Sequence, residues 1–128
     1  MAFLHHSGEL LVLDSTFTDR DVEVGLFDNT VDVIEESDEY EDITSEPDGA
    51  DYSPVTVSNP TVSQEDGVTT VDMGDLSYQV SDATTDVDYV FVRDSTSGDL
   101  IFTNSLKEDY NLDPIDTLDL SNVGMELE

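Results

Sequence analysis

DYVFVRDSTSGDLIFT, residues 88–103, places two runs of β-branched and aromatic residues on either side of a short polar turn. The turn contains Gly98, and glycine readily adopts the positive φ that tight hairpin turns need. This stretch therefore predicts a β-hairpin.

A further strand is predicted at residues 21–27, DVEVGLF, where acidic and apolar residues alternate with a period of two. Such alternation is typical of a strand with one buried face. We expect Glu23 and Gly25 to face outward. The residues of this strand expected to face the core are Val22, Val24 and Leu26.

Similar short runs recur along the chain, with turn residues between them. They fall at residues 55–57, 68–73, 76–80, 118–120 and 123–127, and Glu65-Asp66-Gly67 is interpreted as the turn of a hairpin between the first two. The predicted fold is all-β, a jelly-roll-like β-sandwich of about eight short antiparallel strands. The predicted core includes Val22, Val24, Leu26, Phe27, Val90, Val92 and Ile101.

Residues 7–17 predict a short helix, although a strand fits the same stretch. In a helix, Leu10, Leu13 and Phe17 would share one face, and Ser7 would be the N-cap. A chain of 128 residues is the size of one domain. We therefore expect an N-terminal segment at residues 1–20, used for docking or oligomer contact, and a β-sandwich domain at residues 21–128.

The chain carries 32 acidic residues against three basic ones, Arg20, Arg93 and Lys107, and its formal net charge is −29. At molar salt the Debye length falls to about 3 Å, so these carboxylates no longer repel one another over long distances. This composition favours a high-salt environment. An acidic disordered tail is the alternative, but the alternating apolar runs argue against it.

The same charge makes direct contact with nucleic acid or with an anionic membrane unfavourable, because both need clustered Lys and Arg. No apolar run approaches the roughly 20 residues of a membrane span, and the first residues do not resemble a signal peptide. The most acidic stretch is residues 28–51, and its part from Glu35 to Asp51 is expected to lie on the solvent side because its carboxylates would be costly to bury.

Catalytic motifs are not evident, so we expect a protein that is not an enzyme and requires no cofactor. Cysteine is absent, and the two histidines, His5 and His6, lie at the extreme N-terminus. Carboxylates could gather around Na⁺, K⁺, Mg²⁺ or Ca²⁺, with a diffusely hydrated acidic surface as the alternative. The two candidate clusters are Asp82, Asp86 and Asp88, and Asp38, Glu39, Glu41 and Asp42.

Three tyrosines, Tyr40, Tyr52 and Tyr110, occur in polar stretches and are candidates for contact anchors at an interface. The aromatic residues within the predicted strands are interpreted as core or sheet-face packing.

Three pieces of the sequence carry a resemblance: Val24-Gly25-Leu26-Phe27, Asp51-Tyr52-Ser53-Pro54, and the hairpin from Tyr89 to Phe102. Their layout resembles that of short β-rich structural proteins of tailed phages and their archaeal relatives. The chain departs from this pattern at residues 50–51, where Ala-Asp stands in place of the usual glycine before the tyrosine.

The resemblance implies a virion component, and the acidic composition points to a tailed virus of halophilic archaea. We expect a capsid decoration or turret protein on the virion surface, forming a homo-oligomer and contacting the major capsid protein or other virion proteins. Ala2, Phe3 and Leu4 are the expected assembly contacts. The alternatives are a head–tail connector or tail component of the same virus, and a cellular module that binds cations or carbohydrate. A hydrolase is disfavoured.

Overall fold

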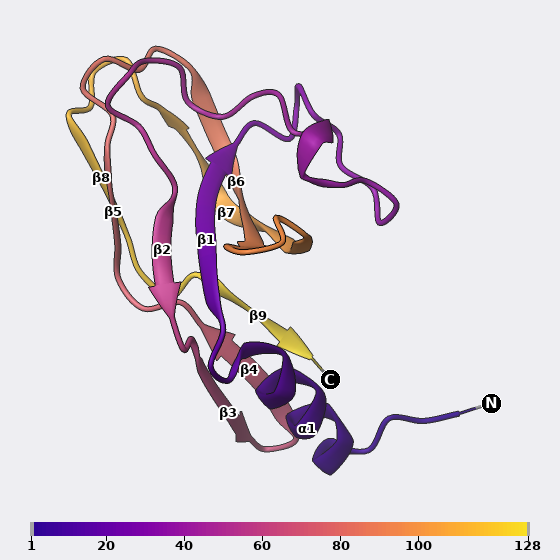
Figure 1. Ribbon diagram of the computed structural model, residues 1–128. Coiled ribbons are helices and arrows are strands. Elements are labelled where there is room, and N and C mark those ends of the chain that lie inside the picture. Colours follow the sequence, from indigo (N-terminus) through magenta and orange to yellow (C-terminus); the bar gives the residue numbers. More distant parts are fainter. Residues whose placement is uncertain (1, 128) are drawn as a thin grey trace.

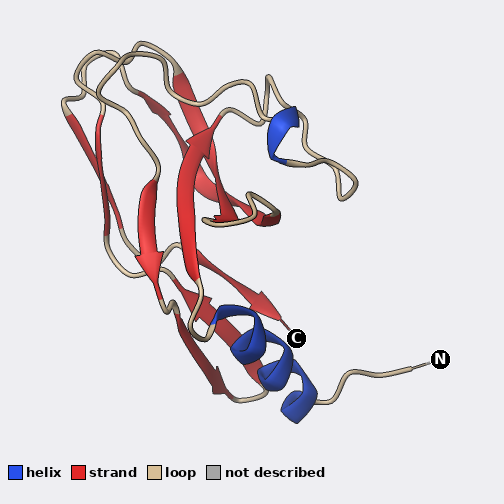
Figure 2. Cartoon of the chain, viewed as in Figure 1, coloured by secondary structure: helices blue, strands red, loops and turns tan. Residues whose placement is uncertain are grey.

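The computed structural model describes residues 2–127, which form nine strands paired antiparallel and one N-terminal helix (Figures 1 and 2). The prediction of a mostly β protein with a short N-terminal helix is confirmed, and the described residues form no closed barrel. The elements are α1 (His6–Phe17), β1 (Asp21–Phe27), the 3₁₀ helix η1 (Tyr40–Asp42), β2 (Val55–Ser58), β3 (Thr61–Glu65), β4 (Val68–Asp72), β5 (Leu76–Gln79), β6 (Asp86–Asp94), β7 (Leu100–Asn111), β8 (Thr117–Leu120) and β9 (Gly124–Leu127).

The strands belong to three sheets. The largest has the order β2-β1-β6-β7, the second has the order β3-β4-β9, and β5 pairs with β8 in the third. The predicted hairpin at residues 88–103 is confirmed as β6 and β7, and β1 lies on the other side of β6, with Val24 opposite Val92. β1 and β6 therefore lie at the centre of the largest sheet, and β7 lies at its edge.

The prediction that residues 55–57 and 68–73 form a hairpin is wrong, because these two strands do not pair with each other. The turn at Asp66 and Gly67 joins β4 to β3, a strand that the sequence analysis did not identify. β3 alternates Val62 with polar residues and has little apolar signal of its own. β2 instead pairs with β1 in the largest sheet.

One apolar cluster joins all three sheets and the helix. It takes side chains from the inward face that the alternation predicted, including Val22, Val24 and Leu26 of β1. Ile101 is only half-buried but packs against this cluster. The other buried members are Leu13, Phe17, Val71, Met73, Leu76, Tyr78, Val80, Ala83, Val87, Val90, Val92, Leu112, Leu118, Leu120 and Val123.

The opposite face of the largest sheet is covered by the segment that follows β1. Phe27, Ile43 and Phe91 form a second buried cluster there, so Phe27 belongs to this cluster rather than to the main one. Gly25 is buried, although the alternation predicted that it faces outward. A Cβ built on Gly25 would overlap the Phe91 ring and lie 2.7 Å from the Tyr52 hydroxyl, so only glycine fits beneath this cover.

The helix begins earlier than predicted, because its N-cap lies two residues before Ser7. Its N-cap is His5, which makes no side-chain capping bond, and Ser7 lies within the first turn. The helix lies at the end of the molecule where β3, β4 and the end of β9 are found, and the N-terminal segment extends away from the body at that same end (Figure 1).

Candidate functional site: an apolar strip and a groove

The inner face of α1 carries an unusual set of side chains. Leu13 and Phe17 enter the main core, as predicted, while Leu10 is half-buried. Glu9 occupies the same face one turn earlier and is only 3% exposed. Its Oε1 atom has no hydrogen-bond partner in the structure. A carboxyl group is thus buried where an apolar side chain would be expected.

The outer face of α1 exposes two large apolar side chains, beside the polar residues 14–15. Leu11 is 70% exposed and Val12 is 48% exposed, and they share this face with Gly8, because residues three and four apart are neighbours on a helix. Leu4 lies against Gly8, since a Cβ built there would be 2.9 Å from Leu4 Cδ1.

We call Phe3, Leu4, Leu11 and Val12 the apolar strip. Phe3 is 76% exposed and Leu4 is 53% exposed. The predicted assembly contacts, Ala2, Phe3 and Leu4, are therefore all available at the surface, on a segment that projects from the body (Figure 1). Elsewhere in the described chain, large exposed apolar side chains occur only at Val31 and Val33.

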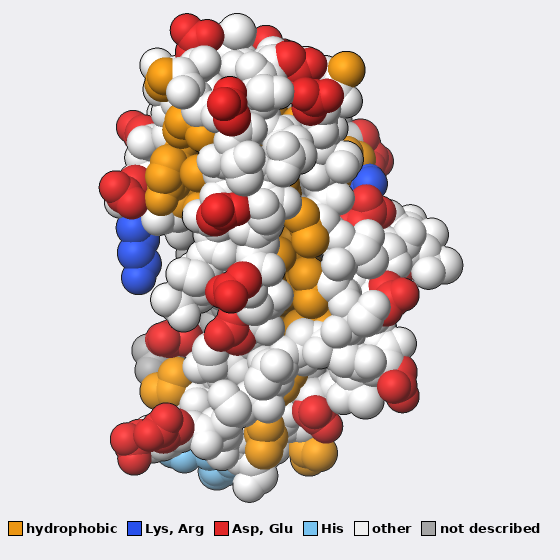
Figure 3. All heavy atoms as spheres, turned by 90° about the vertical axis from the view of Figure 1, so that its left-hand side faces the viewer, with side chains coloured by type: hydrophobic (Ala, Val, Ile, Leu, Met, Phe, Trp, Pro, Cys, Tyr) orange, Lys and Arg blue, Asp and Glu red, His pale blue; other side chains and the backbone are white. Residues whose placement is uncertain are grey.

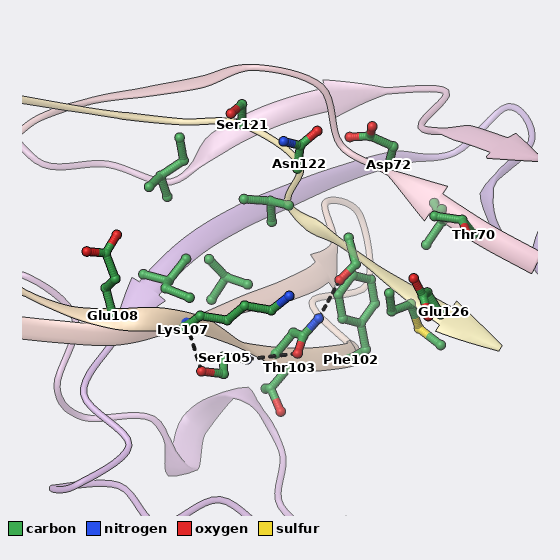
Figure 4. Close-up of a pocket in the computed structure, with 18 of the residues that line it drawn as sticks. Thr70, Asp72, Phe102, Thr103, Ser105, Lys107, Glu108, Ser121, Asn122 and Glu126 are labelled. Atoms are coloured by element: carbon green, nitrogen blue, oxygen red, sulfur yellow. Dashed lines mark hydrogen bonds between the residues drawn. The ribbon is translucent and has the colours of Figure 1, made fainter.

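A groove of about 940 Å³ lies between β7 and β9. Figure 4 shows its two rows of side chains, with Phe102, Thr103 and Ser105 on β7 and with Asp72 and Asn122 on the facing side. The remaining groove residues are Thr70, Val71, Val90, Asn104, Leu106, Lys107, Glu108, Tyr110, Asp119, Leu120, Ser121, Val123, Gly124, Met125 and Glu126.

The two walls of the groove are outer strands that do not pair with each other. β7 pairs only with β6, and β9 pairs only with β4. At one point a side chain bridges the gap, because Asn104 Nδ2 donates a hydrogen bond of 2.7 Å to the backbone oxygen of Gly124. β7 and β9 are therefore further apart than the roughly 4.8 Å that separates paired strands.

β7 contains a large bulge at the groove. Residues 106–109 stand opposite the single residue Asp88, because the pairing shifts from Val87–Tyr110 to Tyr89–Ser105. Within the bulge Lys107 has a φ of 68°, a left-handed conformation that is uncommon for a residue with a long side chain. Bulges and strained residues of this kind are enriched near functional sites.

Lys107 differs from the other two basic residues. Arg20 pairs with Asp94, and Arg93 pairs with Glu23 at 3.3 Å while its guanidinium lies 3.8 Å from the centre of the Tyr40 ring. Among residues 2–127, Lys107 makes no ion pair. It is also the only lysine in the sequence, and its side chain extends along the groove (Figure 4).

Tyr40 and Tyr52, which the sequence suggested as contact anchors, are used inside the molecule. Both hydroxyl groups donate to the Glu46 carboxylate, at 2.7 and 2.9 Å. Tyr52 also stacks on the buried Tyr78, and burial raises the pKa of its hydroxyl well above the ordinary value. Tyr110 is half-buried beside the groove.

Many carboxylates of the acidic stretch are structural. Asp32 accepts backbone bonds of 2.8 Å from Thr44 and Ser45 and also accepts their hydroxyl groups. Burial raises the pKa of Asp32, but these hydrogen bonds outweigh it and hold the pKa below its ordinary value. Hydrogen bonds from Thr84 and Thr85 lower the pKa of Asp48 in the same way.

The candidate cation ligands serve partly in such bonds. Asp82 accepts the backbone N–H groups of Ala50 and Asp51, and Asp88 accepts that of Asn29 at 2.7 Å. Asp86 is exposed at the start of β6. In the described part of the chain, no three His, Asp or Glu side chains gather closely enough to hold a metal ion.

Most other carboxylates remain exposed, including residues 35–36 and 41–42, although Ile43 and Pro47 of the same stretch are buried.

The comparisons with known proteins give no relative for this chain: no family model, curated protein or solved structure matches it. Within residues 2–127, no helix has the length and apolar character that crossing a membrane requires.

The N-terminal contact residues were predictable from the sequence, whereas the groove was not. Its walls combine residues from β4, β7 and β9 and from the end of β8, and no single stretch of the sequence contains more than part of this set. One signal was available, because a lone lysine among so many carboxylates was a reason to ask what it faces.

Proposed function

We propose that this protein is a non-enzymatic structural protein of a haloarchaeal tailed virus, with a place on the capsid surface as a decoration or turret protein. The observation that carries the proposal is the apolar strip. On a chain with a net charge of −29, four large apolar side chains within the first twelve residues are left uncovered by the rest of the protein. Exposed apolar patches of this kind mark contact sites with other proteins.

The acidic surface supports the high-salt part of the proposal. Figure 3 shows acidic side chains spread over one whole face of the molecule, with basic side chains only at its margins. In molar salt such a surface remains hydrated without strong repulsion between neighbouring copies, so apolar contacts can hold an assembly together. Bound Na⁺, K⁺, Mg²⁺ or Ca²⁺ near the surface carboxylates is part of this proposal, and no cofactor is required.

The sequence resemblance supports the proposal of a virion protein, and the apolar strip supports the proposal that copies assemble.

We also propose the finer architecture of a jelly-roll-like sandwich, in which the largest sheet faces the two smaller ones. The shared apolar cluster supports this arrangement, because it draws on β1 and β6 as well as on β4, β5 and β8. An experimental structure would test it directly.

The test of function is where the protein is found. Antibodies raised against the chain would be applied to particles purified in molar salt from cultures that carry the gene. Regular labelling over the head supports a decoration protein, and labelling confined to one vertex or the tail supports the connector or tail alternative. Protein that stays in the cell fraction and is absent from particles overturns the virion proposal.

A matched pair of variants links location to the strip. Leu11→Ser should reduce incorporation into particles, whereas Val33→Ser, at a similarly exposed valine in the acidic stretch, should not. Equal incorporation of both variants would remove the strip from the proposal.

The second candidate is a cellular module that binds cations or carbohydrate, and the groove favours it. Its walls carry hydroxyl and amide groups, including those of Ser121 and Asn122, beside the aromatic side chains of Phe102 and Tyr110. Such a mixture suits a neutral glycan. Glycan and cation titrations of the protein at high salt would test this candidate.

A further inference from the structure

The groove between β7 and β9 has the geometry of a site for an added strand. Each wall is the outer strand of its own sheet, so one side of each backbone lies outside the ladders formed with β6 and β4. Outer strands readily pair with an extended segment of another chain, which gains main-chain hydrogen bonds. Here two such edges line the same groove, and an entering strand would have to displace the bond from Asn104 to the Gly124 oxygen that now bridges them.

The length of the available edge is limited on both sides. On β7 the regular stretch runs from Leu100 to Ser105, because the bulge at residues 106–109 interrupts the pairing beyond it. On the opposite wall, β9 is four residues long, Gly124–Leu127. At about 3.3 Å per residue, an inserted strand would therefore be short, close to four residues.

The N-terminal segment matches this length. Residues 2–5 precede α1, which begins at His6, and the structure shows them as an extended segment projecting from the body (Figure 1). Phe3 and Leu4 are exposed there, and the groove offers the half-buried side chains of Phe102 and Met125 as apolar partners.

The charge of the groove also favours the N-terminal segment as its occupant. The groove is lined by Asp72, Glu108, Asp119 and Glu126 against Lys107 alone, so a segment bearing carboxylates would be repelled. Residues 2–8, AFLHHSG, contain no acidic residue in a chain where 32 of 128 residues are acidic. A copy of this protein can therefore present residues 2–5 to the groove of another copy without adding a negative charge.

We infer that residues 2–5 of one copy lie as an added strand between β7 and β9 of the next copy. The inference rests on the proposed self-assembly, and it names the surface that receives the N-terminal segment. The contact is heterologous, so copies related by a closing rotation would form a ring. Lys107, in the bulge at one end of the edge, offsets part of the acidic charge around the entering segment.

The test uses the natural absence of cysteine from the chain. Full-length protein carrying Leu4→Cys would be mixed in molar salt with a size-tagged full-length protein carrying Ser105→Cys, and the mixture would be oxidised mildly. We expect a disulfide-linked pair containing one tagged and one untagged chain. The control replaces Leu4→Cys with Val33→Cys, a more exposed position that should nevertheless give about tenfold less of the mixed pair.

Light scattering in the same salt measures the oligomeric state of the wild-type protein. This measurement distinguishes failure of the groove inference from failure of the proposed self-assembly. Oligomers without the mixed pair above the Val33→Cys level overturn the groove inference and leave the proposed function standing. A wild-type protein that is monomeric at all concentrations removes the proposed self-assembly and the inference together. A chain carrying both Leu4→Cys and Ser105→Cys that links only within itself shows that the segment occupies its own groove, which also overturns the inference.

Discussion

The Tyr78 hydroxyl donates a hydrogen bond of 2.7 Å to the backbone oxygen of Val24, so a side chain of β5 is tied to the central strand β1 of a different sheet. Both residues are buried, and burial raises the pKa of the Tyr78 hydroxyl well above its ordinary value. This bond satisfies a polar group in the middle of the core, where no water would otherwise reach it.

Tyr78→Phe should therefore lower the free energy of unfolding by about 1–2 kcal/mol, because the Val24 oxygen is left without its buried partner. The measurement is chemical denaturation in molar salt. Tyr110→Phe is the control, since its hydroxyl contacts Glu108 in an exposed position, and it should have little effect. Equal losses for the two variants would mean that the bond between β5 and β1 contributes nothing specific.

Gly25→Ala should be destabilising by about 1–3 kcal/mol, because the added methyl group overlaps the Phe91 ring beneath the second apolar cluster. The comparison is Gly8→Ala in α1. There the new methyl group meets only the end of the flexible Leu4 side chain, and alanine favours a helix. Thermal melting of both variants should show a lower Tm for the first and an unchanged or higher Tm for the second.

Glu9→Gln should raise the free energy of unfolding by about 1–3 kcal/mol, because it replaces a buried carboxyl group that lacks a partner at Oε1. Any loss of an acidic residue also lowers the overall repulsion of this chain. Glu65→Gln, at an exposed position in β3, is therefore the matched control for charge. A gain no larger than that of the control would show that Glu9 is not a buried, uncompensated group.

Asp32 should contribute a pH-dependent part of the stability. Its hydrogen bonds make the pKa lower in the folded state than in the unfolded state, so the carboxylate stabilises the fold above the unfolded pKa. This contribution is lost as the pH falls through the folded pKa. Asp32→Asn should thus melt at a lower temperature than the wild type at pH 7, and the difference should shrink below about pH 4. A difference that is constant from pH 7 to pH 3 would contradict this role.

Salt should have a large effect on the whole molecule. The described residues contain two ion pairs, far fewer than the carboxylates that the sequence carries. As salt is reduced from molar to tens of millimolar, the Debye length grows from about 3 Å to more than 10 Å and repulsion extends across the protein. We expect the Tm to fall steadily over that range. A Tm that does not change between molar salt and 0.1 M would argue against adaptation to high salt.

Much of the fold follows from local sequence. The bounds of β1 match the predicted alternating stretch, and the inward positions of Val22, Val24 and Leu26 follow from the period of two. The hairpin of β6 and β7 was also predictable, because its turn residues and its apolar runs agree. These features depend on residues that lie close together along the chain, so they can be predicted from the sequence alone.

The candidate site was predictable only in part. The exposure of Phe3 and Leu4 was expected, but the outward position of Leu11 was not, since the inner face of α1 was expected to hold the apolar side chains. The structure places Glu9 on the inner face instead. Which face of a helix is buried depends on the sheet it packs against, and β3, against which α1 lies, was itself missed.

The sequence by itself determined the composition of this surface and the positions of most strands, because net charge and period-two alternation are properties of the chain. The tertiary structure alone decided that β2 pairs with β1, that Phe91 and Tyr52 close over Gly25, and that β7 and β9 face each other without pairing across a groove containing Lys107. These relationships join residues that are distant along the chain. Their energies come from burying surfaces against one another, which no local pattern specifies.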